Sequence, residues 1–66
     1  MTKSNAFAII KEANALEDRI ALVQAGTEEY SSLVQAQQEL LDLLLGLKWG
    51  SLHQSKRTGH WFIKVW

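Results

Sequence analysis

The 66-residue sequence contains no cysteine and no proline. The absence of cysteine excludes disulfide bonds, zinc sites built on thiolates and a cysteine nucleophile. The sequence also lacks a glycine-rich phosphate loop, an HExxH zinc motif, a Gly-x-Ser-x-Gly elbow and a calcium-binding loop. We therefore expect no cofactor and no metal, and we expect the protein not to be an enzyme.

Long apolar runs are also missing. The apolar stretch from Ala6 to Ile10 has five residues, which is shorter than the core of a secretory signal. The leucine-rich stretch from Leu40 to Leu47 is interrupted by Asp42 and Gly46, and no run approaches the ~18 apolar residues that a transmembrane helix needs. The sequence thus predicts no transmembrane segment, and we expect the protein to be cytoplasmic.

Apolar residues make up 47% of the sequence and charged residues 21%, a composition typical of a globular chain. We interpret residues 1–66 as a single small domain. A chain of this size buries only ~60% of the surface of its unfolded state, so a monomer would be marginally stable. Small domains without disulfides or metals commonly gain stability by oligomerising, and we expect this one to self-associate.

A first helix is predicted over residues 4–25, with Ser4 or Asn5 as the N-cap and Gly26 as the C-terminal stop. Its apolar residues repeat at alternating spacings of three and four, which indicates a narrow seam facing one other helix. The seam consists of Ala6, Ile9, Ala13, Leu16, Ile20 and Val23.

A second helix is predicted over residues 27–47, with Thr27 as the N-cap and acidic residues in the first turn. Gly46 is unfavourable inside a helix by ~1 kcal/mol, so Gly46 or Gly50 is the alternative end. The short connection at Gly26–Thr27 favours an antiparallel αα-hairpin. The seam of this helix consists of Leu33, Gln37, Leu40, Leu44 and Leu47, and Leu41, Leu43 and Leu45 widen it.

The leucines from 40 to 47 span roughly 200° of such a helix, about twice the width that one partner helix covers. Most of this stripe is explained as core, and the C-terminal segment or another subunit must cover the remainder. We therefore predict an oligomerisation surface formed by Leu33, Leu40, Leu41, Leu44 and Leu45.

Residues 49–66 are predicted to form a β-hairpin because the segment from His60 to Trp66 is rich in aromatic and β-branched residues. A two-residue loop at Arg57–Thr58 pairs Leu52 with Ile63 and Trp49 with Trp66. The face expected to pack on the helices holds Leu52, Trp61, Ile63 and Val65, and the face expected to point outward holds Trp49, His53, Phe62, Lys64 and Trp66. The predicted fold is therefore α+β and mainly helical: an antiparallel αα-hairpin followed by a C-terminal β-hairpin.

Charge is balanced over the whole chain but divided along it. Residues 1–46 hold three basic and seven acidic side chains, whereas residues 47–66 hold four basic and no acidic ones. Such asymmetry indicates an interaction surface. Two interpretations stay open: the basic segment folds back on the acidic helices of its own chain, or it faces a partner.

The basic, aromatic C-terminal segment is the strongest functional signal in the sequence. Tryptophan and arginine are favoured anchors of protein interfaces, whereas His53 and His60 have no third ligand for a metal. The helices show no basic polar face of the kind that binds membranes. The predicted partner-binding residues are Trp49, Lys56, Arg57, Phe62, Lys64 and Trp66.

These features favour a small non-enzymatic protein–protein interaction module, a homo-oligomer that regulates or inhibits an unidentified partner protein. The alternative is a nucleic-acid-binding protein that uses the same hairpin for base stacking and phosphate contact. A net charge of zero and a pI of 6.7 count against this alternative. Cysteine-free chains of this size are common among regulatory adaptors, toxin–antitoxin partners and phage-encoded proteins, an analogy of size and composition alone.

Overall fold

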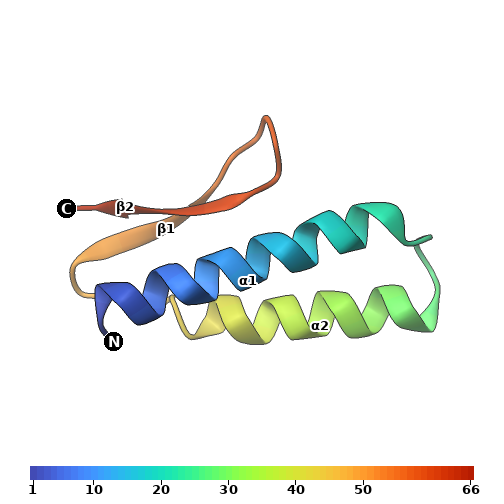
Figure 1. Ribbon diagram of the computed structural model, residues 1–66, viewed down its shortest axis with the longest axis horizontal. Helices are drawn as coiled ribbons and strands as arrows, with labels where there is room; N and C mark the ends of the chain where they lie inside the picture. Colours follow the sequence, from blue (N-terminus) through green and yellow to red (C-terminus); the bar gives the residue numbers. More distant parts are fainter.

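The computed structural model describes all 66 residues, and its elements follow in the order helix, helix, strand, strand. They are α1 (Lys3–Leu22), α2 (Glu28–Asp42), β1 (Gly50–Gln54) and β2 (Trp61–Val65). Figure 1 shows α2 running antiparallel to α1, with the β-hairpin on the opposite side of α1. The predicted α+β order is therefore confirmed, and α1 is the middle layer.

Helix α1 begins and ends earlier than predicted. Its N-cap is Thr2, whose hydroxyl oxygen accepts a hydrogen bond from the backbone N–H of Asn5 at 3.2 Å; the prediction of Ser4 or Asn5 as the cap is wrong. The helix ends at Leu22 because Val23 is extended. Gly26, at a φ of +89°, belongs to the connection between the helices and not to the end of α1.

Helix α2 starts as predicted and stops five residues early. The Thr27 hydroxyl oxygen accepts a hydrogen bond from the Tyr30 N–H at 3.2 Å, which confirms the cap. After Asp42 the chain tightens into a turn, in which the Leu44 N–H donates to the Leu41 carbonyl at 2.9 Å. Gly46 lies in this turn, in keeping with its low helix propensity.

The early end of α2 removes the wide leucine stripe. In a helix that reached residue 47, the leucines would point around more than half of its circumference. In the turn instead, Leu44 is 1% exposed and fills the core, whereas Leu43 and Leu45 are 57% and 73% exposed. The argument for self-association from stripe width is therefore wrong, because it assumed helical geometry beyond Asp42.

The core lies where α1 meets both α2 and the hairpin. Its central cluster consists of Ala6, Ile10, Ala13, Leu41 and Leu44. Ile10, and not the predicted Ile9, is buried on α1, since α1 packs on two sides and a single seam does not describe it. Partly buried side chains surround the cluster: Ile9, Leu40, Leu47, Trp49, Leu52, Trp61 and Ile63.

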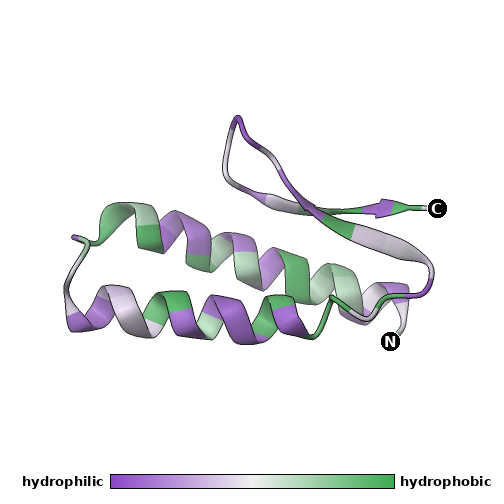
Figure 2. Cartoon of the chain, turned by 180° about the vertical axis from the view of Figure 1, so that it is seen from behind, coloured by the Kyte–Doolittle hydropathy of each residue, from purple (hydrophilic) through white to green (hydrophobic).

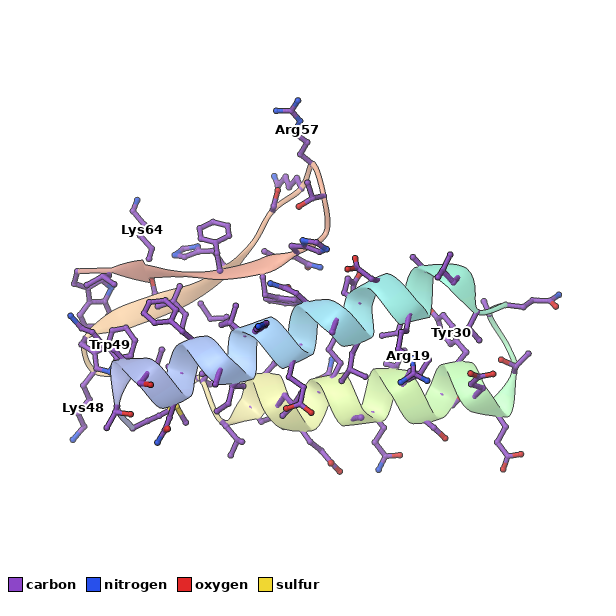
Figure 3. All side chains as sticks on the ribbon, viewed as in Figure 1. Arg19, Tyr30, Lys48, Trp49, Arg57 and Lys64 are labelled. Carbon is purple, nitrogen blue, oxygen red and sulfur yellow. The ribbon has the colours of Figure 1, made fainter.

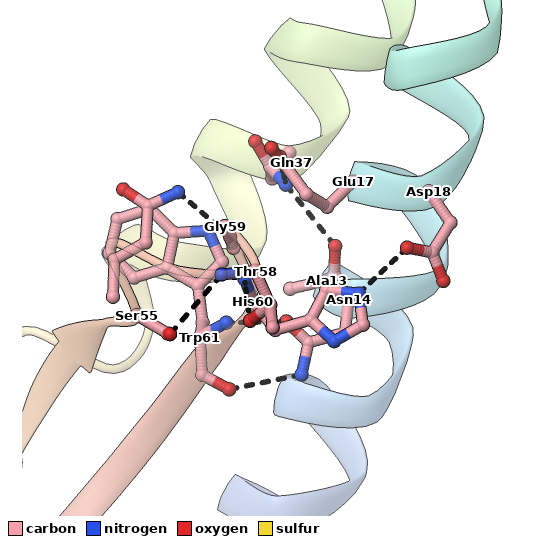
Figure 4. Close-up of polar contacts among 11 residues, drawn as sticks. Ala13, Asn14, Glu17, Asp18, Gln37, Ser55, Thr58, Gly59, His60 and Trp61 are labelled. Carbon is pink, nitrogen blue, oxygen red and sulfur yellow. Dashed lines mark hydrogen bonds and ion pairs between the residues drawn. The ribbon is translucent and has the colours of Figure 1, made fainter.

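The polar member of the α2 seam, Gln37, is 8% exposed, and its amide N–H₂ is hydrogen-bonded. Its side-chain N–H₂ donates to the Ala13 carbonyl at 3.2 Å and to the Glu17 carboxylate at 2.7 Å (Figure 4). Buried polar groups are costly unless they are hydrogen-bonded. These two bonds to α1 therefore let a glutamine occupy a core position, and they hold the two helices in one alignment.

The hairpin has the predicted register: Leu52 lies opposite Ile63, and Gln54 opposite Trp61. Beyond the strands, the Trp66 N–H donates to the Trp49 carbonyl at 3.1 Å. The loop is longer than predicted, because the Ser55 N–H donates to the His60 carbonyl at 2.8 Å and residues 56–59 connect them. A two-residue hairpin turn usually needs positive φ, and in this loop only Gly59 has it, at +79°.

Neither helix has both the length and the apolar character that crossing a membrane requires. Figure 2 shows instead that hydrophilic residues alternate with hydrophobic ones along both helices. The apolar side chains that face inward come from α1, α2 and the hairpin together, so the core depends on all three segments.

The first prediction concerns the turn after α2. Replacing Leu44 with alanine should lower the free energy of unfolding by about 2–5 kcal/mol, because a fully enclosed leucine leaves a cavity. Leu22→Ala is the matched control, since Leu22 is 87% exposed, and it should change stability by no more than about 0.5 kcal/mol. Urea denaturation followed by circular dichroism gives both values; equal midpoints for the two variants would contradict the placement of Leu44.

Candidate interaction surfaces

The hairpin is fixed to α1 by a pair of hydrogen bonds from one side chain. The Trp61 N–H donates to the Asn14 side-chain oxygen at 2.6 Å, and the Asn14 N–H₂ donates to the Trp61 carbonyl at 3.0 Å (Figure 4). Trp61 lies opposite Gln54 at a position that is not hydrogen-bonded across the hairpin, so its backbone N–H and C=O groups point away from β1. The Asn14 amide therefore bonds the outer edge of β2 in the way a third strand would.

One ion pair joins the hairpin to the helices. His60 Nε2 lies 2.7 Å from Asp18 Oδ1, and the two side chains are 43% and 66% exposed. An exposed pair of this kind contributes little stability. The basic segment does fold back on α1 of its own chain, as one of the two interpretations expected, but its lysines and arginines form no ion pair with the acidic helices.

The inward face of the hairpin is largely as predicted, since Leu52, Trp61 and Ile63 pack against the core. Val65 was expected to face inward and is 48% exposed, because this end of β2 extends past the helices. The indole N–H of Trp61 is buried without a hydrogen-bond partner. Trp61 is therefore held by apolar packing and by its backbone bonds to Asn14.

Trp49 was predicted to point outward, and this prediction is wrong. Trp49 precedes β1, so the alternation of the strand does not determine its direction. Its ring centroid lies 6.1 Å from that of Phe7, and the Lys3 ammonium lies 5.6 Å from the ring centroid. Its indole N–H donates to the Met1 carbonyl at 3.2 Å. Trp49 thus covers the N-terminal end of α1 (Figure 3).

Two of the predicted partner-binding residues, Phe62 and Lys64, lie on the side of the hairpin that faces away from the helices. We call this side the outer face; it consists of Ser51, His53, Phe62 and Lys64, and we include with it Trp66, which follows β2, and Lys56 and Arg57 in the adjoining loop. The rings of His53 and Phe62 stack at a centroid distance of 5.6 Å and an angle of 22°. Lys64 and Arg57 point away from both helices in Figure 3.

A second surface was not predicted as a unit. At the end of the molecule where α2 gives way to the turn, Met1, Leu43, Leu47 and Trp49 line one pocket, and we call them, with the exposed Leu45 of the same turn, the apolar end. Met1 is 55% exposed, and a pocket of about 450 Å³ opens between Met1, Leu43 and Trp49, with Leu47 and Lys48 also lining it. Sequence patterns missed this surface because they placed Leu43 and Leu47 on a helix.

The leucines predicted for oligomerisation are mostly enclosed by their own chain. Leu33, Leu41 and Leu44 are buried, and Leu40 is half-buried against the core. Leu45 alone of this set is freely exposed. Of the predicted oligomerisation residues, Leu45 is therefore the one most available for contact with a second copy.

The structure brings together no group of three histidine, aspartate or glutamate side chains that could hold a metal ion. Comparison of the chain with protein-family models, with curated proteins and with solved structures finds no match. The function must therefore be inferred from the outer face and the apolar end.

The second prediction tests how the hairpin is attached. Replacing Asn14 with alanine should lower the free energy of unfolding by about 1–3 kcal/mol, because both partly buried hydrogen bonds to Trp61 are lost. Asn5→Ala is the control, since Asn5 is exposed and its side chain forms no hydrogen bond. Thermal unfolding followed by tryptophan fluorescence compares the two, and equal stability of the two variants would show that Asn14 does not hold the hairpin.

Proposed function

We propose that this protein is a small, non-enzymatic protein–protein interaction module that regulates or inhibits a partner protein and self-associates through its apolar end. The observation that carries the proposal is the exposure of Leu43 and Leu45, at 57% and 73%, beside an open pocket. A contiguous apolar patch on a small protein usually marks a contact surface.

A second copy of the chain is the occupant we favour. A two-fold axis would bring the same patch of both copies together, so the two apolar ends would cover each other. Lys48 is the one charged side chain that lines the pocket, so an apolar partner surface fits it better than a charged one. Figure 3 shows Lys48 extending away from the core, at the rim of this surface.

The size of the core supports the same conclusion. Only 8 of the 66 residues are buried, and a core this small leaves a monomer marginally stable. A standard interface covers about 800 Å² on each partner, about a sixth of the accessible surface of 4835 Å². Association through an interface of this size would therefore add buried area to a small core.

The third prediction tests self-association. The protein should sediment as a dimer or larger species at micromolar concentration, and Leu43→Glu should shift it to the 7.5 kDa monomer because a carboxylate in a desolvated contact is unfavourable. Leu22→Glu is the matched control: Leu22 is also exposed, but it lies at the other end of α1, so this variant should remain associated.

Circular dichroism of both variants checks that the helices remain folded, as expected for substitutions at exposed positions. A wild-type protein that stays monomeric over the whole accessible concentration range would contradict self-association. Equal dissociation by Leu43→Glu and Leu22→Glu would show that charge in general, and not the apolar end, controls assembly.

A further inference from the structure

We propose that the outer face of the hairpin binds single-stranded nucleic acid, with Phe62 and Trp66 stacking on unpaired bases and basic side chains contacting the phosphates. This binding site is separate from the apolar end and does not depend on self-association. It follows from three observations: the exposed rings, the free cations, and the absence of acidic groups on this face.

The rings are available because the fold leaves them uncovered. Phe62 is 46% exposed and Trp66 is 78% exposed. Phe62 and Lys64 belong to the same face, because side chains alternate along a strand, and Trp66 follows directly after β2. Phe62 and Trp66 are about 13 Å apart along an extended chain, at about 3.3 Å per residue. The face therefore offers two separate stacking positions.

The His53 ring extends the first of these positions. It stacks on Phe62 from the neighbouring strand, and its Nε2 lies 2.8 Å from the Ser51 hydroxyl oxygen. These contacts fix the orientation of both rings before any ligand arrives. A pre-oriented aromatic surface loses less side-chain freedom on binding than mobile rings would.

The cations of this face are unpaired. Lys56, Arg57 and Lys64 form no ion pair with any carboxylate, and residues 47–66 include no aspartate or glutamate. The acidic groups nearest to the loop are engaged on α1: Asp18 with His60, and Glu17 with Gln37. A net charge of zero for the whole chain therefore does not describe the charge of the outer face, which is positive.

Single strands fit this surface better than a duplex does. Stacking on aromatic side chains requires unpaired bases, and it is the main source of affinity in proteins that bind single strands without sequence preference. Three or four cations are few for duplex binding, in which phosphate contacts supply most of the affinity. A short sheet face with two stacking positions and a few cations is suited to a segment of a few nucleotides.

The test uses the full chain and a fluorescein-labelled oligothymidylate of about twelve nucleotides, within the range of sites seen for small single-strand binders. Fluorescence anisotropy at physiological salt should give a Kd of about 1–100 μM, the range of non-specific nucleic-acid binding, and tighter binding at low salt. The logarithm of the affinity should fall with the logarithm of salt with a slope near −2, about −0.7 for each of three phosphate contacts.

Variants separate stacking from charge. Phe62→Ala and Trp66→Ala should each weaken binding about tenfold, the expected loss of one stacked base, whereas Leu22→Ala should leave it unchanged. Lys64→Gln should reduce the salt slope by about 0.7, whereas Lys11→Gln, which removes an exposed lysine from α1, should not alter the slope. Near-UV circular dichroism identifies any variant that has lost its tertiary structure. If one ring variant has lost it, the affinity of the other ring variant tests the stacking.

Three outcomes would overturn the proposal. The first is the absence of binding at millimolar protein in low salt. The second is equal affinity for polyglutamate and the oligonucleotide, which would identify a surface for acidic peptides. The third is equal affinity for the single strand and its duplex with no effect of either ring variant, since the rings would then take no part.

Discussion

The packing of α1 against two neighbours at once depends on small side chains at its centre. Ala6 and Ala13 are 0% exposed, and an alanine fills a closely packed position without holding the neighbouring element away. On one side α2 approaches near enough for Gln37 to reach the Ala13 carbonyl. On the other, β2 approaches near enough for Asn14 to bond the Trp61 backbone on both sides. Larger residues in these places would strain the packing.

The two surfaces discussed above follow from this central position of α1. Because the hairpin packs on α1 and not in a groove between two long helices, only one of its faces is covered, and Phe62 and Trp66 remain in solvent. Because α2 ends at Asp42, the chain must cross from α2 to β1 through residues 43–49. That crossing segment carries the leucines of the apolar end, so both surfaces result from where regular structure stops.

The sequence predicted those features that local chemistry determines. Thr27 was identified as the N-cap because a threonine followed by two glutamates is typical of a helix start. The hairpin register followed from placing Leu52 opposite Ile63. The ends of the helices were not predictable in this way. The heptad pattern continues through Leu44 and Leu47, yet tertiary packing draws Leu44 into the core through a tight turn. Trp49 was misplaced for a related reason, since strand alternation was applied one residue outside the strand.

The candidate surfaces were less predictable than the fold. The residues of the outer face within the strands could be grouped from alternation alone, and Phe62 and Lys64 are indeed on one face. The lack of ion pairs at Lys56, Arg57 and Lys64 could not be inferred, because it depends on the distances between the hairpin and carboxylates on two helices. Likewise, no pattern in the sequence signals that an asparagine in mid-helix will bond a strand 47 residues away.

The Asn14 contact has a consequence for solubility. A two-stranded sheet has two open edges, and open edges are templates on which further strands add and fibres grow. On β2 the Asn14 amide already bonds the backbone of Trp61. An incoming strand therefore finds the outer edge of β2 already occupied at Trp61, and strand addition along this edge is disfavoured.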